Sequence, residues 1–446
     1  MSRLPIAALC LALPAMGAIL TVGPGRPYAS VGAAVAQAAP GDTIRIEAGT
    51  YPGNLILDKR LTLEGVGRPV IRGDGRASVI TVRADGCTIR GLAIEHSGSM
   101  LVHEDSGILL HSSGNRIEDN DLRDVLFGIY FYSSGHNTVA NNVIHGRANL
   151  EIGERGAGIH IYNAVDNTIV GNTIIQTRDG MYLQYANHSM IRGNRVSEVR
   201  YGLHYMYSDD NTFEENSFSR NIAGAAIMYS RRITFRHNVF AHNRGVSSFG
   251  ILFQEADDCL AEENALVDNA VGIFMEALRG TVLRRNLIAA NDTALRMFAS
   301  ATGNSFEANN FIDNLSPLEV IGKSTDTKWN GARTGNYWSE YEGYDLDANG
   351  VGDVPFQIQN VFQRLEGEYP RIRIYLYSPA SQAMAAAEKA FPVFEGSREF
   401  DRAPLMKPAA LEIPKQGRRP RAWAPVALSL VLVGIPAAVY RKGQKS

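Results

Sequence analysis

The sequence has no basic excess, few cysteines, and no helical spacing of apolar residues in its central part. Lysine and arginine total 44 against 46 aspartate and glutamate residues, a formal net charge of −2. This balance argues against a nucleic-acid-binding protein. Between residues 107 and 309 the apolar residues alternate with a period of two, so a leucine-rich repeat with one helix per turn is disfavoured.

The central part instead repeats one short pattern nine times. Each copy has a Gly, an apolar alternation, a polar turn, an apolar pair and an Asn, and most copies start 22 residues apart. A fixed period of this size indicates a solenoid. The first positions are Gly107, Gly128, Gly158, Gly180, Gly202, Gly224, Gly250, Gly272 and Ala294. The Asn positions are Asn120, Asn142, Asn172, Asn194, Asn216, Asn238, Asn264, Asn286 and Asn309.

Two or three short alternating runs in each copy, separated by Asn, Ser, Asp and Gly, are typical of strands and turns. We therefore predict an all-β fold, a right-handed parallel β-helix whose coils stack about 4.8 Å apart. Asn tolerates left-handed backbone and can hydrogen-bond its copies above and below. The repeated asparagines are accordingly interpreted as structural rather than catalytic.

The three cysteines do not form a disulfide framework. Cys10 lies in the N-terminal apolar run, whereas Cys87 and Cys259 fall in one column of the repeat, seven coils apart. Seven coils correspond to roughly 34 Å, which excludes a disulfide between them. We expect both as small buried residues, with metal binding by a free thiol as the alternative.

The two ends of the chain predict export and a membrane tether. Residues 1–20 match a secretory signal peptide, with cleavage expected between Ala15 and Ala18. Residues 422–440 form a 19-residue segment without charge, flanked by basic residues, which predicts a C-terminal transmembrane helix. The body should then lie in the periplasm, tethered to the inner membrane.

Four segments are expected between these ends. Residues 21–77 form an N-terminal cap with a helix at 30–39 and the first coils, because the open end of stacked strands must be covered. Residues 78–316 carry the repeats, and residues 317–377 close the coil. Residues 378–421 form a tail with a short helix at 381–390 followed by an extended proline-rich stretch.

The alternation also predicts which side chains face outward. Residues one and three positions after the Gly are apolar and should face the core, so residues two and four positions after it face out. Thr, Ser, Lys and Glu are usual on a solvated strand, whereas this surface is a stripe of aromatics, His and Met. The outward pairs are Tyr130 and Tyr132, His160 and Tyr162, Tyr182 and Gln184, His204 and Met206, Ala226 and Met228, Leu252 and Gln254, and Phe274 and Glu276.

Insertions at residues 97–106, 146–157 and 240–249 should hang over this stripe. His and Met without thiolate form a ligand set that suits copper(I). An aromatic-rich protein interface explains the same stripe, and spacing alone favours that interface slightly. The candidate copper ligands are His204, Met206 and Met228 with His160, and as an alternative cluster His96, Met100 and His103.

Residues 345–353, Asp-Leu-Asp-Ala-Asn-Gly-Val-Gly-Asp, have the oxygen-ligand spacing of a calcium loop. The Glu expected at position twelve is replaced by Phe356. The segment is therefore a degenerate calcium site or a turn organised by side-chain hydrogen bonds, and we favour the turn.

Several segments occur in combination: the export signal, residues 40–44 (Pro-Gly-Asp-Thr-Ile) and 49–51 (Gly-Thr-Tyr), the Gly and Asn coils, and the closing residues 335–339 (Gly-Asn-Tyr-Trp-Ser) and 343–353. Together they resemble the NosD family, whose members mature the copper site of nitrous oxide reductase. The resemblance covers residues 20 to about 410.

The resemblance implies a non-enzymatic role. With an ABC transporter in the inner membrane and a copper chaperone lipoprotein, such a protein helps to place copper and sulfur in nitrous oxide reductase. If so, the tail would reach away from the coils and dock on the transporter through apolar anchors at Phe391, Phe394, Leu405 and Met406.

The alternative is a β-helix lyase or epimerase acting on uronate polymers. Such enzymes need a cationic groove with carboxylate and acid–base groups. The predicted stripe offers His160, Tyr182 and His204 but almost no charge before Glu276 and Arg296, so this reading is second.

Overall fold

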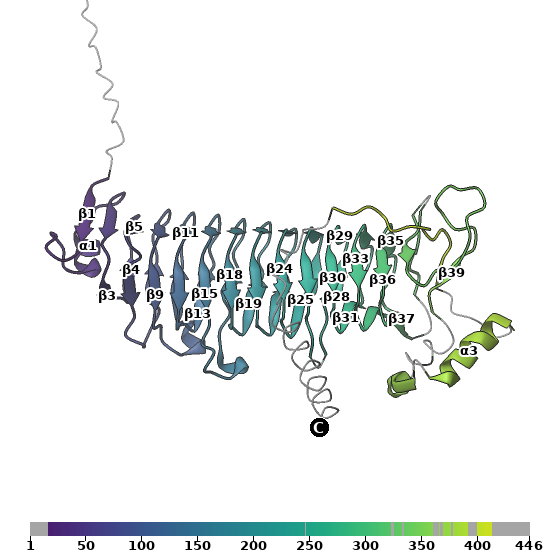
Figure 1. Cartoon of the computed structure of the whole chain (residues 1–446). Helices are drawn as coiled ribbons and strands as arrows, with labels where there is room; N and C mark the ends of the chain where they lie inside the picture. Colours follow the sequence, from purple (N-terminus) through teal and green to yellow (C-terminus); the bar gives the residue numbers. More distant parts are fainter. Residues whose placement is uncertain are drawn as a thin grey trace, which may run out of the picture. The chain divides into compact units, whose positions relative to one another are not determined.

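A computed structural model describes residues 17–245, 247–322, 325–331, 334–359, 365, 369–375, 378–390 and 399–412. Within these ranges the chain is a parallel β-solenoid (Figure 1). A regular coil contributes one strand to each of three parallel sheets, here named A, B and C, with 13, 13 and 12 strands. The predicted all-β solenoid with coils of about 22 residues is confirmed.

The strands are short, because each coil turns three corners within its 22 or so residues. Sheet A contains β1 (Ile19–Val22), β2 (Thr43–Ile46), β5 (Thr62–Gly65), β8 (Thr88–Arg90), β11 (Arg116–Glu118), β14 (Thr138–Ala140), β17 (Thr168–Val170), β20 (Met190–Arg192), β23 (Thr212–Glu214), β26 (Thr234–Arg236), β29 (Leu260–Glu262), β32 (Val282–Arg284) and β35 (Ser305–Glu307). Sheet B contains β3 (Thr50–Pro52), β6 (Val70–Arg72), β9 (Ala93–Glu95), β12 (Asp121–Arg123), β15 (Val143–His145), β18 (Thr173–Ile175), β21 (Arg195–Ser197), β24 (Ser217–Ser219), β27 (Val239–Ala241), β30 (Ala265–Val267), β33 (Leu287–Ala289), β36 (Asn310–Ile312) and β38 (Tyr337–Trp338). Sheet C contains β4 (Leu55–Leu57), β7 (Ile80–Val82), β10 (Ser106–Leu110), β13 (Phe127–Tyr132), β16 (Ile159–Tyr162), β19 (Asp179–Gln184), β22 (Tyr201–Met206), β25 (Ala223–Arg231), β28 (Ile251–Asp257), β31 (Val271–Glu276), β34 (Thr293–Phe298) and β37 (Ser316–Ile321).

The repeated glycines lie on sheet C, where neighbouring coils approach closely. A Cβ atom on Gly158 would lie 2.8 Å from the carbonyl oxygen of Gly180, and the same contact recurs along the column. The residues one and three positions after each Gly are buried at 0 or 1% exposure, for example Ile159 and Ile161. The predicted inward positions are therefore confirmed, and they build one continuous apolar core.

The asparagine column is a hydrogen-bonded ladder at the corner before sheet B. In each step the backbone N–H and the side-chain Nδ2 of one Asn donate to the Oδ1 of the next, as from Asn194 to Asn216 at 3.0 Å. The side chain also donates to a core carbonyl, as from Asn216 to Ile191 at 2.9 Å. The structural interpretation of these residues is confirmed. Shorter ladders of the same design occupy the other two corners, including Asn137 and Asn243.

Helix α1 (Val31–Gln37) caps the N-terminal end as predicted. Ser30 is its N-cap and accepts a hydrogen bond from the backbone N–H of Ala33, and Val31, Ala34 and Val35 are buried. Lys59 donates to the carbonyls of Val35, Ala36 and Ala38 at the other end of the helix. Other helical segments within the described residues are η1 (Leu101–His103), η2 (Ile152–Glu154), η3 (Pro370–Tyr375) and α3 (Pro379–Ala390).

The C-terminal end is closed by a segment that comes from much later in the chain, residues 399–412, here called the strap. Its strand β40 (Phe400–Asp401) pairs with β39 (Phe356–Gln357). Asp401 is fully buried and accepts hydrogen bonds from the backbone of Asn336, at 2.7 Å, and from the indole of Trp338. A carboxylate oxygen of Asp401 thus takes the place of the next Asn Oδ1 in the ladder.

Two predictions for this end need correction. The segment expected to close the coil, residues 317–377, still contributes strands to it, because β37 and β38 extend sheets C and B. The strap does not reach away from the coils: it runs back along them (Figure 1, yellow), with Ala409 hydrogen-bonded to Asn310 in both directions. The buried partners of Asp401 and the unpaired polar groups of the last coil explain this docking. The helix predicted at 381–390 is present as α3.

Several predicted segments lie outside the described residues. They are most of the signal segment (residues 1–16), the anchors Phe391 and Phe394, and residues 422–440. Strand β1 begins at Ile19, within the predicted 1–20 segment and after the expected cleavage region. Across the ranges described above, no helix has the length and apolarity needed to cross a bilayer.

The two remaining local predictions concern the cysteines and the acidic loop. Cys87 and Cys259 are buried free thiols, and burial raises the pKa of Cys259 to about 11. In the 345–353 loop, Asp345 accepts from the backbone N–H groups of Asn349 and Gly350 at 3.1 and 2.8 Å. Its oxygens therefore organise a turn, as favoured from the sequence.

Candidate functional site

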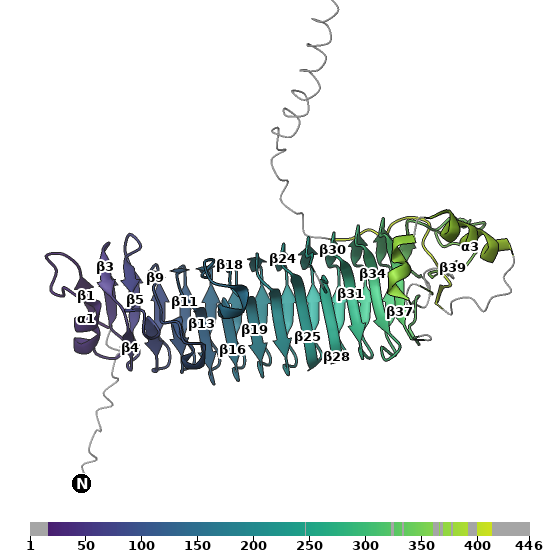
Figure 2. The same cartoon turned by 90° about the horizontal axis from the view of Figure 1, so that it is seen from below.

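The strands of sheet C, among them β13, β16 and β19, follow one another along the solenoid (Figure 2). Their pairing gives the outward stripe the predicted register: His160 pairs with Tyr130 on one side and Tyr182 on the other, and His204 follows Tyr182. The second column places Met206 beside Met228. Both columns therefore run along the solenoid axis as the alternation predicts, with one side chain of each column per coil.

The inserted loops cover the stripe in two places. Ala157, from the second insertion, packs with Tyr130, and the phenol of Tyr130 donates to Glu104 of the first insertion at 2.9 Å. Phe249, from the third insertion, packs with Ala226 and stacks on Tyr201. The predicted position of these loops is confirmed. Between the first insertion, at Glu104, and the second, at Ala157, a groove remains open.

This groove has a volume of about 440 Å³. Its floor is aromatic and its edges carry charge of both signs, which is the composition of a site for a ligand rather than of a solvated strand face. The lining residues are Glu104, Phe127, Tyr130, Tyr132, Ala157, His160, Tyr162, Arg178, Asp179, Tyr182 and Gln184.

His160 forms the centre of the groove floor. Its ring stacks on Tyr130 at 4.3 Å between centroids and lies 4.5 Å from Tyr182. Its Nδ1 is buried and has no hydrogen-bond partner among the described residues. Burial lowers the pKa of His160 to about 3, so the ring is neutral at physiological pH.

His204 lies in a charged cluster on the coil after Tyr182, next to the groove lining. Its side chain is 13% exposed, and Nδ1 lies 3.3 Å from Oδ2 of Asp179, which is 1% exposed. Arg200 donates to both oxygens of Asp179 at 2.9 and 2.7 Å, and Arg178 lies 3.5 Å away. Hydrogen bonds from His204 and Arg200 outweigh the burial of this carboxyl group and lower the pKa of Asp179 to about 2.

Three of the predicted ligands are brought together. His204 and Met206 lie on one face of β22, about 7 Å apart along the strand, and Met228 is one coil from Met206, about 4.8 Å away. Met206 Sδ also accepts a weak hydrogen bond from the phenol of Tyr182 at 3.8 Å. The register therefore places the three residues next to one another on two neighbouring coils of sheet C.

His160 is not part of that area. Its ring is two coils from His204, about 10 Å, and Tyr182 stands between the two rings. Two nitrogens that share one metal ion are at most about 4 Å apart. In this structure a single ion cannot bind both histidines.

The alternative cluster lies at the first inserted loop, where the backbone N–H of His103 donates to the carbonyl of Met100 at 3.1 Å. His96 is hydrogen-bonded to Asp124 at 2.8 Å, and Met100, at the start of the first inserted loop, is 53% exposed. His103 is exposed at the end of η1. Neither histidine belongs to a group of three close His, Cys, Asp or Glu side chains in the described part of the chain.

Sequence reasoning missed the charge in the groove. Asp179, Arg178 and Arg200 precede the repeated Gly by one or two residues, at the corner that leads into sheet C, and Glu104 lies on an inserted loop. The expectation of almost no carboxylate or cation on this face is therefore wrong. The 22-residue spacing of Arg178 and Arg200 was a signal that they hold the same place on neighbouring coils, where the backbone N–H of Arg200 donates to the carbonyl of Arg178.

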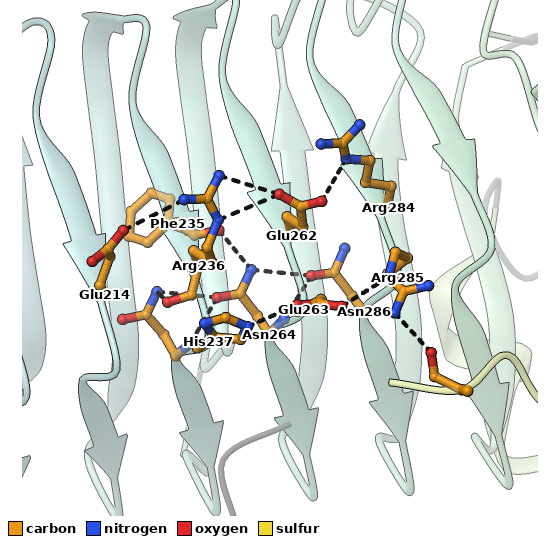
Figure 3. Close-up of polar contacts among 12 residues, drawn as sticks. Glu214, Phe235, Arg236, His237, Glu262, Glu263, Asn264, Arg284, Arg285 and Asn286 are labelled. Carbon is orange, nitrogen blue, oxygen red and sulfur yellow. Dashed lines mark hydrogen bonds and ion pairs between the residues drawn. The ribbon is translucent and has the colours of Figure 1, made fainter. Parts of the chain in front are cut away.

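One close group of three metal-binding side chain types exists among the described residues, and it lies away from the groove. Donor atoms of His237, Glu263 and Glu412 are within 4.8 Å of one another. Glu263 already accepts from His237 at 2.7 Å and from Arg285 at 2.8 Å, and Arg285 also donates to the strap carbonyl of Ala410 (Figure 3). The group is an ion-pair network that fastens the strap.

Comparison with known proteins is decisive for the family. A family model described as "Periplasmic copper-binding protein (NosD)" matches residues 60–152 and 146–343. A probable ABC transporter binding protein NosD from Pseudomonas aeruginosa is 34% identical over 418 residues, covering 87% of this chain and 96% of that protein. The chain belongs to the NosD family. A second NosD of the same description, from Stutzerimonas stutzeri, is 30% identical over 380 residues, covering 81% and 86% of the two chains.

The NosD family is described as periplasmic, which agrees with the predicted compartment of the body. Among solved structures, the catalytic domain of a GH87 α-1,3-glucanase in complex with tetrasaccharides has a TM-score of 0.54 at 14% identity. The likeness covers 73% of this chain and 70% of that one. At such low identity it shows a shared β-helix fold and carries no information on activity.

Proposed function

We propose that this protein is an exported accessory protein that binds copper(I) at His204, Met206 and Met228 and passes it on during assembly of the copper site of nitrous oxide reductase. Family membership supports the copper role, and the open groove edge supports the position of the site. The observation that carries the proposal is the strand register, which puts one histidine and two methionines on the outer face of two neighbouring coils.

The donor set fits copper(I) rather than a harder ion. Thioether sulfur binds soft cations, and imidazole adds a borderline donor. In the structure Nε2 of His204 has no hydrogen-bond partner among the described residues, whereas Nδ1 faces Asp179. A site of three ligands at the edge of a groove stays open on one side, which favours transfer of the ion over permanent storage.

The proposed partners follow from the relatives. Two are named as ABC transporter binding proteins, and we extend that association to this chain. Nitrous oxide reductase is the proposed recipient, and a copper chaperone lipoprotein the proposed source. A tether formed by residues 422–440 would raise the local concentration of this protein near its membrane partners.

The site is tested by replacing His204 and Met206 together with Ala. We expect copper(I) affinity, measured by competition with a chromogenic chelator, to fall at least about 100-fold, since two of three ligands are lost. The matched control is His96→Ala with Met100→Ala, which removes the same two donor types elsewhere. Equal affinities in the unsubstituted chain and both variants would rule out the site at His204 and Met206. A loss of affinity confined to the control would place the copper site at the first inserted loop instead.

A second candidate function is an enzyme acting on acidic polysaccharide. It is favoured by charge at the groove: Arg178 and Asp179 line it, and His204 and Arg200 contact Asp179 from beside it. A carboxylate-oriented histidine beside a tyrosine and two cations can serve acid–base chemistry on a uronate. Lyase activity is tested by incubating the protein with alginate and pectate and measuring the absorbance of unsaturated uronates. Clear turnover that Asp179→Asn abolishes would favour the enzyme over the copper-binding role.

A further inference from the structure

The position of Asp179 beside the proposed copper ligand has a specific consequence. Asp179 is the first residue of β19, directly before the repeated Gly180, and its carboxylate is 1% exposed. It reaches Nδ1 of His204, which comes from the next coil, at 3.3 Å. The coil itself does not need an acid at this position, because the equivalent residue one coil later is Tyr201.

Arg200 fixes the carboxylate from the other side. It donates from Nε to Oδ1 at 2.9 Å and from Nη2 to Oδ2 at 2.7 Å, a two-point contact that permits one orientation. An ionised carboxylate only accepts hydrogen bonds. The proton of a neutral His204 must therefore reside on Nδ1, which leaves the lone pair on Nε2 free.

We propose that Asp179, held by Arg200, is the positioning residue that fixes the ring and tautomer of His204 and so presents Nε2 to copper(I). The identity of the ion rests on the proposed function. Histidine ligands in metalloproteins gain orientation and basicity when the other ring nitrogen donates to a carboxylate. Tyr182 packs edge-on against the ring at 4.6 Å and Tyr201 lies at 5.1 Å, so the imidazole is also confined sideways.

The chain offers a matched control for this arrangement. Asp268 contacts Nδ1 of His242 at 2.6 Å and accepts from Nε and Nη2 of Arg244, the same three residue types in the same roles. Asp268 is 39% exposed and lies outside the groove. Replacing each Asp with Asn therefore removes the same charge and contact at a buried groove position and at an exposed position elsewhere.

The experiment uses the full chain labelled with ¹⁵N-histidine. In the unsubstituted, metal-free protein we expect the His204 resonances to show Nδ1 protonated, and in Asp179→Asn to show a mixture of tautomers. Copper(I) affinity should fall about 10- to 100-fold in Asp179→Asn and stay unchanged in Asp268→Asn. Circular dichroism checks that both variants are folded.

Three outcomes overturn the proposal. A His204 ring protonated on Nε2 in the unsubstituted protein contradicts it without any variant, and so does a ring that exchanges freely between tautomers. Copper(I) affinity that depends on His204 and Met206 but not on Asp179 rejects the positioning role while the proposed function stands. No copper(I) binding by the unsubstituted chain would instead reject the proposed function, and with it the assignment of Nε2 as a copper donor.

Discussion

Two kinds of side-chain column run along this solenoid, and they differ in how completely their polar atoms are bonded. In the asparagine ladder before sheet B every amide is buried and donates both along the column and to a core carbonyl. In the outer column of sheet C, His160 Nδ1 has no partner among the described residues, and His204 bonds through one nitrogen. The same coil spacing therefore builds a saturated column that holds the fold and an unsaturated one that can hold a ligand.

The largest expected effect is on stability, from breaking the saturated column. Asn216→Ala removes the acceptor of two Asn194 groups and the donor to Ile191. Leaving buried amide groups unbonded should lower the free energy of unfolding by about 4 kcal/mol, measured by urea denaturation. Thr168→Ala, at an exposed position on sheet A, is the control and should change stability by less than about 0.5 kcal/mol. A loss for Asn216→Ala no larger than the control's would show that the ladder is not what stabilises the coils.

The second effect comes from the unbonded histidine and depends on pH. The folded pKa of His160, about 3, lies below its ordinary value of 6.5, so the unfolded state takes up the proton first as pH falls. Stability contributed by neutral His160 is present above pH 6.5 and is lost as pH falls toward 3, at about 1.4 kcal/mol per unit.

His160→Phe keeps the aromatic stacking and removes this titration. Relative to the unsubstituted protein, the variant should gain about 3 kcal/mol between pH 7 and pH 4.5, read from urea unfolding at both pH values. His136→Phe, at an exposed position with no such burial, serves as the control. A pH-independent difference would mean that His160 takes up its proton at the same pH in the folded and unfolded states, so that burial does not lower its pKa.

The third effect tests where the ladder ends. Asp401→Ala removes the acceptor for Asn336 and for the indole of Trp338. The free energy of unfolding should fall by about 2 kcal/mol. This is less than for Asn216→Ala, because burial already disfavours the charged carboxylate of Asp401. The strap should then become accessible to limited proteolysis near residues 402–412. Arg402→Ala, exposed beside it, should leave the cleavage pattern unchanged. Protection equal to that of the unsubstituted chain would show that other strap contacts suffice.

The smallest effect on stability is expected in the ligand-holding column. His204→Ala with Met206→Ala removes outward, partly exposed side chains and should shift the thermal midpoint by no more than about 2 °C, while copper(I) binding is lost. Differential scanning calorimetry of the metal-free proteins measures this. A shift in the thermal midpoint as large as that of Asn216→Ala would show that the outer column of sheet C stabilises the fold as much as the asparagine ladder does.

The sequence repeat alone predicts most of the fold. A 22-residue period with strand alternation and a recurrent Asn admits one arrangement, because each residue's coil position follows from its position in the period. Inward and outward columns, the neighbours Met206 and Met228, and the burial of Cys87 and Cys259 were predictable for that reason.

Tertiary structure decided what the period does not encode. Inserted residues such as Glu104 and Ala157 have no register, and only packing shows that they cover the stripe. Rotamers at the corners decided that Asp179 contacts both Arg200 and His204, while Tyr182 keeps His160 apart from His204. The strap returns over more than sixty residues to complete a ladder. No local pattern predicts such a contact, because its free energy comes from polar groups that only the finished last coil leaves unpaired.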